Sequence, residues 1–120
     1  MPFRLLAAAL FVLCLAAGGL ARAENTIEHA MGATEVPSEP RRVVTLTNET
    51  TEAALAVGVR PVGATRSWYG DPWYPHLGDR LSDTADLGTE LAVNVELVAA
   101  LEPDLIIGSR KRDEEIYGVQ

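Results

Sequence analysis

RVVTLTNETTEAALAVGVRPVGATRSWYGDPWYP, residues 42–75, decides the fold of this chain. The run Val43–Leu46 is short, apolar and rich in β-branched side chains, as is typical of a strand buried on both faces. The pair Thr47–Asn48 can cap a helix after it, and Gly58 can end that helix in a left-handed conformation. Pro61–Ala64 then starts a second strand, after a connection of about the length that a right-handed βαβ crossover needs. The stretch therefore predicts an α/β protein.

The segments around this unit add a hairpin and a turn-rich region. Thr26–Pro37 has a Met-Gly pair between two alternating arms, which predicts an antiparallel hairpin at an edge. Residues 76–86 are polar and rich in turn formers, so we expect a loop with one helical turn. Asp86–Gly88 is expected to form a very short strand.

The C-terminal part repeats the strand–helix alternation. Asn94 can cap a helix that Pro103 stops, and Leu105–Gly108 reads as a third buried strand. Asp113–Gln120 predicts the start of another helix with Asp113 as its cap. The predicted architecture is a short parallel sheet with βαβ crossovers, preceded by a β-hairpin. Three parallel strands make a thin core, so we expect the sequence to be the front part of a longer protein.

The N-terminus has the pattern of an export signal. Arg4 precedes an apolar run, and Ala21–Ala23 forms an A-x-A cleavage site, so residues 1–23 are predicted to be a cleaved signal peptide. The only cysteine, Cys14, lies in this leader and follows a leucine rather than the small residue of a lipoprotein signal. We therefore expect no lipid anchor. The remaining chain, residues 24–120, would carry no disulfide, thiol nucleophile or cysteine-bound metal.

The charge balance limits the partners. The mature chain would keep all 17 acidic side chains but lose two of the ten basic ones, Arg4 and Arg22. A chain this acidic does not favour nucleic acid or an anionic membrane as its partner. The composition therefore indicates a soluble exported protein.

Three motifs in order carry a family resemblance. They are TLTNETTEAALAVGVRPVGA (45–64), SWYGDPWY (67–74) and VNVELVAALEPDLIIGSRKRDEEIY (93–117). In this order they resemble motifs of the periplasmic iron–siderophore-binding proteins, foremost those for hydroxamate and citrate–hydroxamate chelates. The resemblance implies the N-terminal lobe of a two-lobe protein whose lobes are joined by a long helix. It implies a monomeric periplasmic component of an ABC importer, which binds a ferric siderophore and delivers it to the inner-membrane permease. Iron would enter only inside the chelate, without a separate cofactor.

A ferric siderophore is a bulky, oxygen-rich and often anionic ligand, which suits planar guanidinium groups and flat aromatic rings. Arg66, Trp68 and Trp73 follow the second strand, and Arg110 and Arg112 follow the third. Because ligands of open α/β sheets bind beyond the carboxyl ends of the strands, we expect both loops to converge on one ligand.

Each candidate also has a structural interpretation. Trp73 can cover a small core, and the two arginines can be solvated beside the acidic residues 113–115. The resemblance assigns Glu96 to docking on permease arginines, with Glu52 as second candidate. The alternative is an ordinary first-turn acid that stabilises the helix dipole.

No catalytic or metal pattern accompanies these residues. His29 and His76 stand on different elements, and no phosphate-binding glycine loop or G-x-S-x-G motif is present. We therefore expect neither an enzyme nor a metal site. The alternatives are a haem or cobalamin carrier of the same fold, which would need a tyrosine or histidine as axial ligand, and a small exported enzyme or a remnant that binds no chelate.

Overall fold

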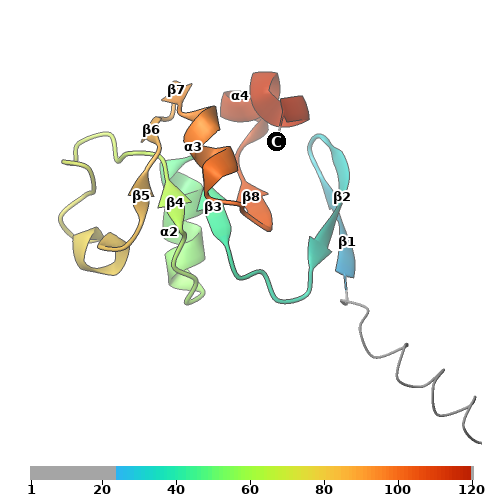
Figure 1. Ribbon diagram of the computed structural model, residues 1–120, viewed down its shortest axis with the longest axis horizontal. Helices are drawn as coiled ribbons and strands as arrows, with labels where there is room; N and C mark the ends of the chain where they lie inside the picture. Colours follow the sequence, from blue (N-terminus) through green and yellow to red (C-terminus); the bar gives the residue numbers. More distant parts are fainter. Residues whose placement is uncertain (1–23, 120) are drawn as a thin grey trace, which may run out of the picture.

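The computed structural model describes residues 24–119. Their centre is a four-stranded parallel sheet in the order β5-β4-β3-β8, as Figure 1 shows. The strands are β3 (Val43–Thr45), β4 (Gly63–Ala64), β5 (Ala85–Asp86) and β8 (Leu105–Ile107). The predicted parallel sheet is confirmed.

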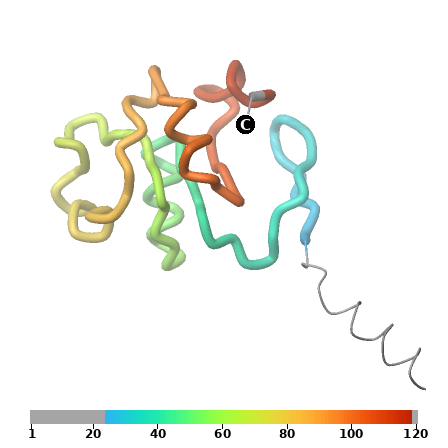
Figure 2. Tube along the Cα trace, in the orientation of Figure 1, coloured from blue at the N-terminus to red at the C-terminus, as the bar shows by residue number. Residues whose placement is uncertain are grey.

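Two helices lie on opposite faces of this sheet. Helix α2 (Asn48–Ala56) connects β3 to β4, and α3 (Val95–Ala100) precedes β8; Figures 1 and 2 show α3 in front of the sheet and α2 behind it. In the register, Val44 pairs with Gly63 of β4 on one side and with Ile106 of β8 on the other. The strand that follows β3 along the chain, β4, therefore lies on one side of β3, and the later strand β8 lies on the other side. This order places a topological switch point between β3 and β8.

Each face of the sheet has its own apolar cluster. The cluster under α3 contains the buried residues Val44, Leu46, Leu87 and Val98. The second cluster joins Leu55 of α2 to Leu77 and Leu81 in the loop after β4, where η2 (Gly78–Leu81) supplies the predicted helical turn. The first cluster packs α3 against the sheet, and the second packs α2 against the loop after β4.

Local capping explains where the helices begin. Thr47 is the N-cap of α2, and its hydroxyl accepts the N–H of Thr50 at 3.2 Å while the Thr50 hydroxyl accepts the N–H of Thr47 at 3.2 Å. Asn94 caps α3 by accepting the N–H of Leu97 at 3.0 Å. Gly58 has φ +83°, the left-handed conformation that favours glycine. The predicted helix boundaries are confirmed here.

Asp104, directly before the edge strand β8, binds the residues that lead into β3. Its carboxylate accepts the backbone N–H groups of Arg41 at 2.9 Å and Arg42 at 2.8 Å. The start of β8 is thereby fixed beside the start of β3, so the ends of both strands come out at one edge.

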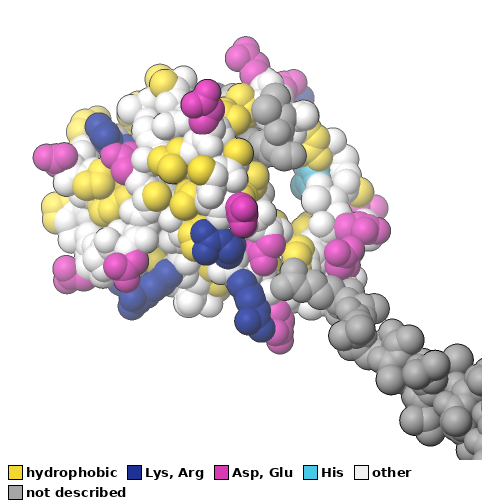
Figure 3. Space-filling view, in the orientation of Figure 1, with side chains coloured by type: hydrophobic (Ala, Val, Ile, Leu, Met, Phe, Trp, Pro, Cys, Tyr) yellow, Lys and Arg dark blue, Asp and Glu magenta, His cyan; other side chains and the backbone are white. Residues whose placement is uncertain are grey.

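The predicted N-terminal hairpin is confirmed as β1 (Glu24–His29) and β2 (Gly32–Pro37), in antiparallel register. It forms a two-stranded sheet of its own and does not extend the parallel sheet. Between hairpin, β8 and the last helical segment lies a cavity of about 390 Å³, where Figure 3 shows an opening. His29 and Tyr117 both line it and meet edge to face, with the ring centroids 5.9 Å apart.

The C-terminal helix begins earlier than predicted. Helix α4 (Arg110–Asp113) and η3 (Glu114–Val119) follow β8 directly, and Ser109 stands at the N-cap. The prediction of Asp113 as the cap is wrong, because its carboxylate instead reaches back to accept the N–H of Ser109 at 2.8 Å. Arg112 therefore lies on a helix instead of a loop.

No helix among residues 24–119 is long and apolar enough to cross a bilayer. The predicted signal peptide, residues 1–23 with Cys14, lies outside the described residues.

Candidate functional site

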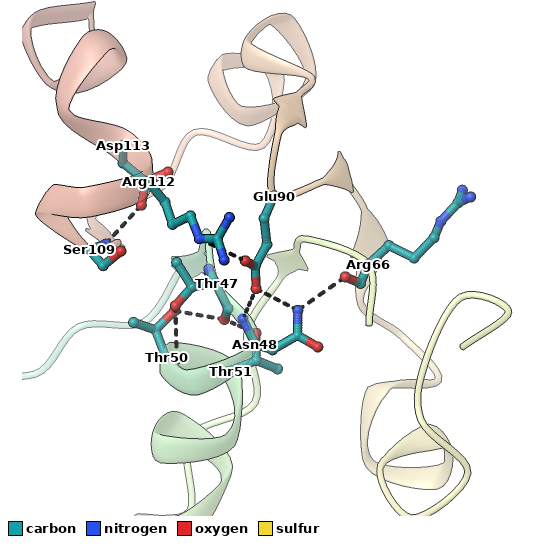
Figure 4. Close-up of polar contacts among 9 residues, drawn as sticks. All are labelled: Thr47, Asn48, Thr50, Thr51, Arg66, Glu90, Ser109, Arg112 and Asp113. Carbon is teal, nitrogen blue, oxygen red and sulfur yellow. Dashed lines mark hydrogen bonds and ion pairs between the residues drawn. The ribbon is translucent and has the colours of Figure 1, made fainter. Parts of the chain in front are cut away.

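The loops that follow the parallel strands meet at the switch point. The N–H of Leu46 donates to the carbonyl of Ile107 at 2.9 Å, which joins the ends of β3 and β8. The N–H of Arg66 donates to the carbonyl of Gly88 at 2.7 Å, which joins the loop after β4 to β6 (Gly88–Thr89). Figure 4 shows polar side chains from these segments gathered at one place.

Arg112 and Trp68 form the exposed part of this cluster. The guanidinium carbon of Arg112, on α4, lies 5.3 Å from the centroid of the Trp68 ring, on the loop after β4. Trp68 is 47% exposed, and the Arg112 side chain is 35% exposed. A cation over an aromatic face is attractive, and both groups keep surface free for a ligand. The segments that follow β4 and β8 thus meet at this pair, and their convergence on one ligand stays a prediction.

A buried carboxylate lies behind the pair. Glu90, in the turn between β6 and β7 (Ala92–Val93), has a side chain only 1% exposed. Its Oε1 accepts both the backbone N–H and the side-chain N–H of Asn48, each at 2.6 Å. Its Oε2 lies 3.5 Å from Nε of Arg112. Glu90 thus joins the start of α2 to the arginine of α4.

Glu90 is the functional candidate that the sequence analysis missed. It stands alone in a short turn, without a motif around it. The one available signal is its place after a short strand at the sheet edge that carries the predicted site. That position predicts that Glu90 lies near the other loops, but it does not predict which residues the Glu90 carboxylate contacts.

Arg66 is turned away from this cluster. Its guanidinium donates to Oδ2 of Asp86 from Nη2 at 2.6 Å and from Nε at 3.2 Å, and Figure 4 shows it pointing away from Arg112. Burial raises the pKa of Asp86, but the hydrogen bonds from Arg66 and from the N–H of Gly88 outweigh it, so that pKa lies below its usual value. The hydrogen bond to Asp86 correspondingly raises the pKa of Arg66. Its predicted contact with ligand stays a prediction.

Asp113 is the second buried acid of the cluster. Burial raises the pKa of its carboxyl, the N–H of Ser109 opposes this, and the charge of Glu90 raises it further. The charge of Arg112 lowers it, but the net direction is upward. Asp113 is therefore affected by the charges of both Glu90 and Arg112, and its ionisation is disfavoured there.

Known proteins share this part of the fold. The chain is 52% identical over 94 residues to the probable siderophore-binding lipoprotein YfiY of Bacillus subtilis, a match that covers 78% of this chain and 29% of the relative. It is 35% identical over 77 residues to the achromobactin-binding periplasmic protein of Dickeya dadantii, covering 64% and 25%. The crystal structure of Staphylococcus aureus SirA complexed with staphyloferrin B matches with a TM-score of 0.77 and 43% identity, over 79% of this chain and 32% of that one.

This chain is homologous to part of the siderophore-binding proteins of ABC importers. It spans only about 30% of the length of these relatives. No protein-family model matches it. Vitamin B12-binding proteins of Salmonella are also similar, at 36% identity over 74 residues, covering 62% of this chain and 25% of theirs. The names of the Bacillus, Dickeya and Salmonella relatives all describe binding proteins.

The other predicted site residues lie apart from Arg112 and Trp68. Trp73 is half-buried and packs against Leu55, Leu77 and Leu81, the arrangement expected of a residue that covers the core. Arg110 is exposed and lines the cavity beside the hairpin. Their contact with ligand stays a prediction.

The docking candidates and the histidines also lie at separate places. Glu96 is exposed in the first turn of α3. Glu52 lies 3.3 Å from Nε2 of His76, and His29 bonds Thr34 within the hairpin at 2.7 Å. Among residues 24–119, no three His, Asp or Glu side chains are grouped closely enough to hold a metal ion.

Proposed function

We propose that this chain captures a ferric siderophore and presents it to an ABC permease. The observation that carries the proposal is the Arg112 guanidinium held over the exposed ring of Trp68, at the switch point of a fold shared with siderophore binders. Capture involves no covalent chemistry.

The pair suits an oxygen-rich chelate for two reasons. The planar guanidinium of Arg112 offers paired donors to carboxylate or hydroxamate oxygens, and the Trp68 ring covers the apolar part of the ligand at small entropic cost.

The test is titration with ferric staphyloferrin B and ferric citrate, followed by calorimetry and by tryptophan emission. Arg112→Ala should weaken binding by about tenfold to a hundredfold, since a hydrogen bond to a charged group contributes about 1.5–3 kcal/mol. Arg80→Ala, which removes an exposed cation on η2, is the matched control and should leave the affinity unchanged. If the folded wild-type chain binds neither ferric complex, the proposal is wrong.

Cobalamin is the second candidate, because vitamin B12-binding proteins are 36% identical to this chain over 74 residues. Cyanocobalamin and haem are therefore titrated beside the ferric complexes. Saturable binding of either one, with no binding of the ferric complexes, would mean that this compound is the ligand and that a ferric siderophore is not.

We propose export to the periplasm, with removal of residues 1–23. One relative is named a periplasmic protein and another a lipoprotein, so both work outside the cytoplasm. The mass of the protein isolated from a periplasmic extract distinguishes a cleaved chain from a lipid-anchored one. A chain that begins at Glu24 supports cleavage, and a lipid-modified Cys14 contradicts it.

Docking on the permease is proposed for Glu96. Its exposure in the first turn of α3 supports the proposal, since a docking carboxylate must reach a partner's arginines. Glu52 is the weaker candidate because it already lies beside His76.

A further inference from the structure

A buried carboxylate needs partners, and those of Glu90 fix its position closely. Both donors on Oε1 come from Asn48, the first residue of α2, at 2.6 Å. Asn48 is itself held, because its side-chain N–H also reaches the carbonyl of Arg66 at 3.2 Å. The carboxylate is thus fixed to the helix start and to the loop that carries Trp68.

Arg112 is oriented by two contacts at once. In the described part of the chain, its ion pair runs from Nε to Oε2 of Glu90 at 3.5 Å, and its guanidinium carbon lies 5.3 Å from the centroid of the Trp68 ring. Nε is the inner nitrogen of the guanidinium, so this arrangement leaves the two terminal nitrogens for an external anion. Planar, paired recognition of a carboxylate depends on that orientation.

We propose that Glu90 is the positioning residue for Arg112: it holds Nε so that the guanidinium stacks on Trp68 and presents its terminal nitrogens to the ligand. The expected effect of Glu90 on ligand affinity rests on the proposed function. Its expected effect on how well Arg112 covers the Trp68 ring needs no ligand.

The variant Glu90→Gln tests the proposal by the direction in which the ligand affinity changes. Glutamine has nearly the same size and still accepts from Asn48, but it loses the negative charge beside Arg112. If Glu90 were only a nearby acid, its removal would strengthen the binding of an anionic chelate, because one like charge is gone. If Glu90 positions Arg112, the affinity for ferric staphyloferrin B falls by about tenfold (1.4 kcal/mol).

The matched control is Glu115→Gln. It removes the same charge from an exposed position on η3, in the same C-terminal segment. We expect its affinity to equal or slightly exceed that of the wild type. Glu90→Gln binding as tightly as this control would overturn the proposal.

A ligand-free readout separates positioning from helix capping. In a Trp73→Phe background, Trp68 is the only tryptophan, and acrylamide quenching measures how well Arg112 covers its ring. Glu90→Gln and Arg112→Ala should raise the quenching constant by the same factor, and the double variant should add nothing. A residue that only caps α2 would lower stability and leave quenching unchanged, which would refute the positioning role.

Asn48→Ala keeps the experiment decisive if Glu90→Gln does not fold. It removes one donor to Glu90 without changing any charge and should raise quenching of Trp68 less than Arg112→Ala does. Unchanged quenching in this variant would also contradict the proposal. Failure of the wild type to bind any ferric complex would remove the proposed function, whereas the quenching series would still decide the orientation of Arg112.

Discussion

Leu46→Ala should destabilise this protein strongly, because Leu46 closes the cluster under α3 directly before the cap of α2. Its side chain is 1% exposed and packs with Val44, Leu87 and Val98. Truncation of a fully buried leucine costs about 2–5 kcal/mol, which includes the cavity left behind, so we expect about 3 kcal/mol. In a domain of this size, about 1 kcal/mol corresponds to 4–8 °C in Tm, so the transition should fall by about 12 °C or more.

Thermal unfolding followed by far-ultraviolet circular dichroism measures this shift. Leu91→Ala is the matched control, because Leu91 is 72% exposed, and such surface changes stay within about 0.5 kcal/mol. If the two leucine variants unfolded at the same temperature, the reasoning would be refuted, since Leu46 would then contribute no more than a surface side chain.

Three further predictions concern the cap, the second buried acid and the docking residue. Thr47→Ala should cost about 1 kcal/mol in urea unfolding, because the N–H of Thr50 loses its acceptor. Asp113→Asn should gain stability relative to the wild type as the pH rises from about 4, the usual carboxyl pKa. The raised pKa of Asp113 means that its ionisation is penalised in the fold, whereas asparagine still accepts from Ser109 and pays no such penalty. A difference independent of pH in urea titrations would contradict this. Glu96→Lys should leave ferric-siderophore affinity unchanged and abolish permease-dependent uptake; normal uptake would disprove its docking role.

The sequence predicts well those features that neighbouring residues decide. The β-branched run before Thr47 gives β3, and the side chains of Thr47 and Asn94 cap the helices that follow them. Each of these effects acts within one helical turn or one strand. The order of motifs in turn gave the siderophore-binding resemblance, which the homologues support.

The site depends on which loops become neighbours, and local sequence carries little of that information. The positions of the strands predicted that Arg66 and Arg112 lie at one edge of the sheet, but they did not predict which residues these arginines contact. Arg66 bonds Asp86 because β4 and β5 are adjacent and their ends bring the two charges together. Arg112 meets Glu90 because α4 follows β8, and the turn between β6 and β7 bonds Asn48 just after the neighbouring strand β3. Such contacts follow from strand order, which no motif around Glu90 encodes.

The site is assembled from one helix and two loops that are separate in the sequence, which would link ligand occupancy to the lifetime of the folded protein. A ligand held by α4, the loop after β4 and the turn that carries Glu90 would be released if any one of them opened. Such a ligand, at a hundred times its dissociation constant, adds about 2.7 kcal/mol to the free energy of unfolding by mass action. This nearly equals the loss expected for Leu46→Ala, so a loaded protein would tolerate a core lesion that leaves the empty one open to proteases. If the ligand is the proposed ferric siderophore, iron supply would then set how long a destabilised copy survives.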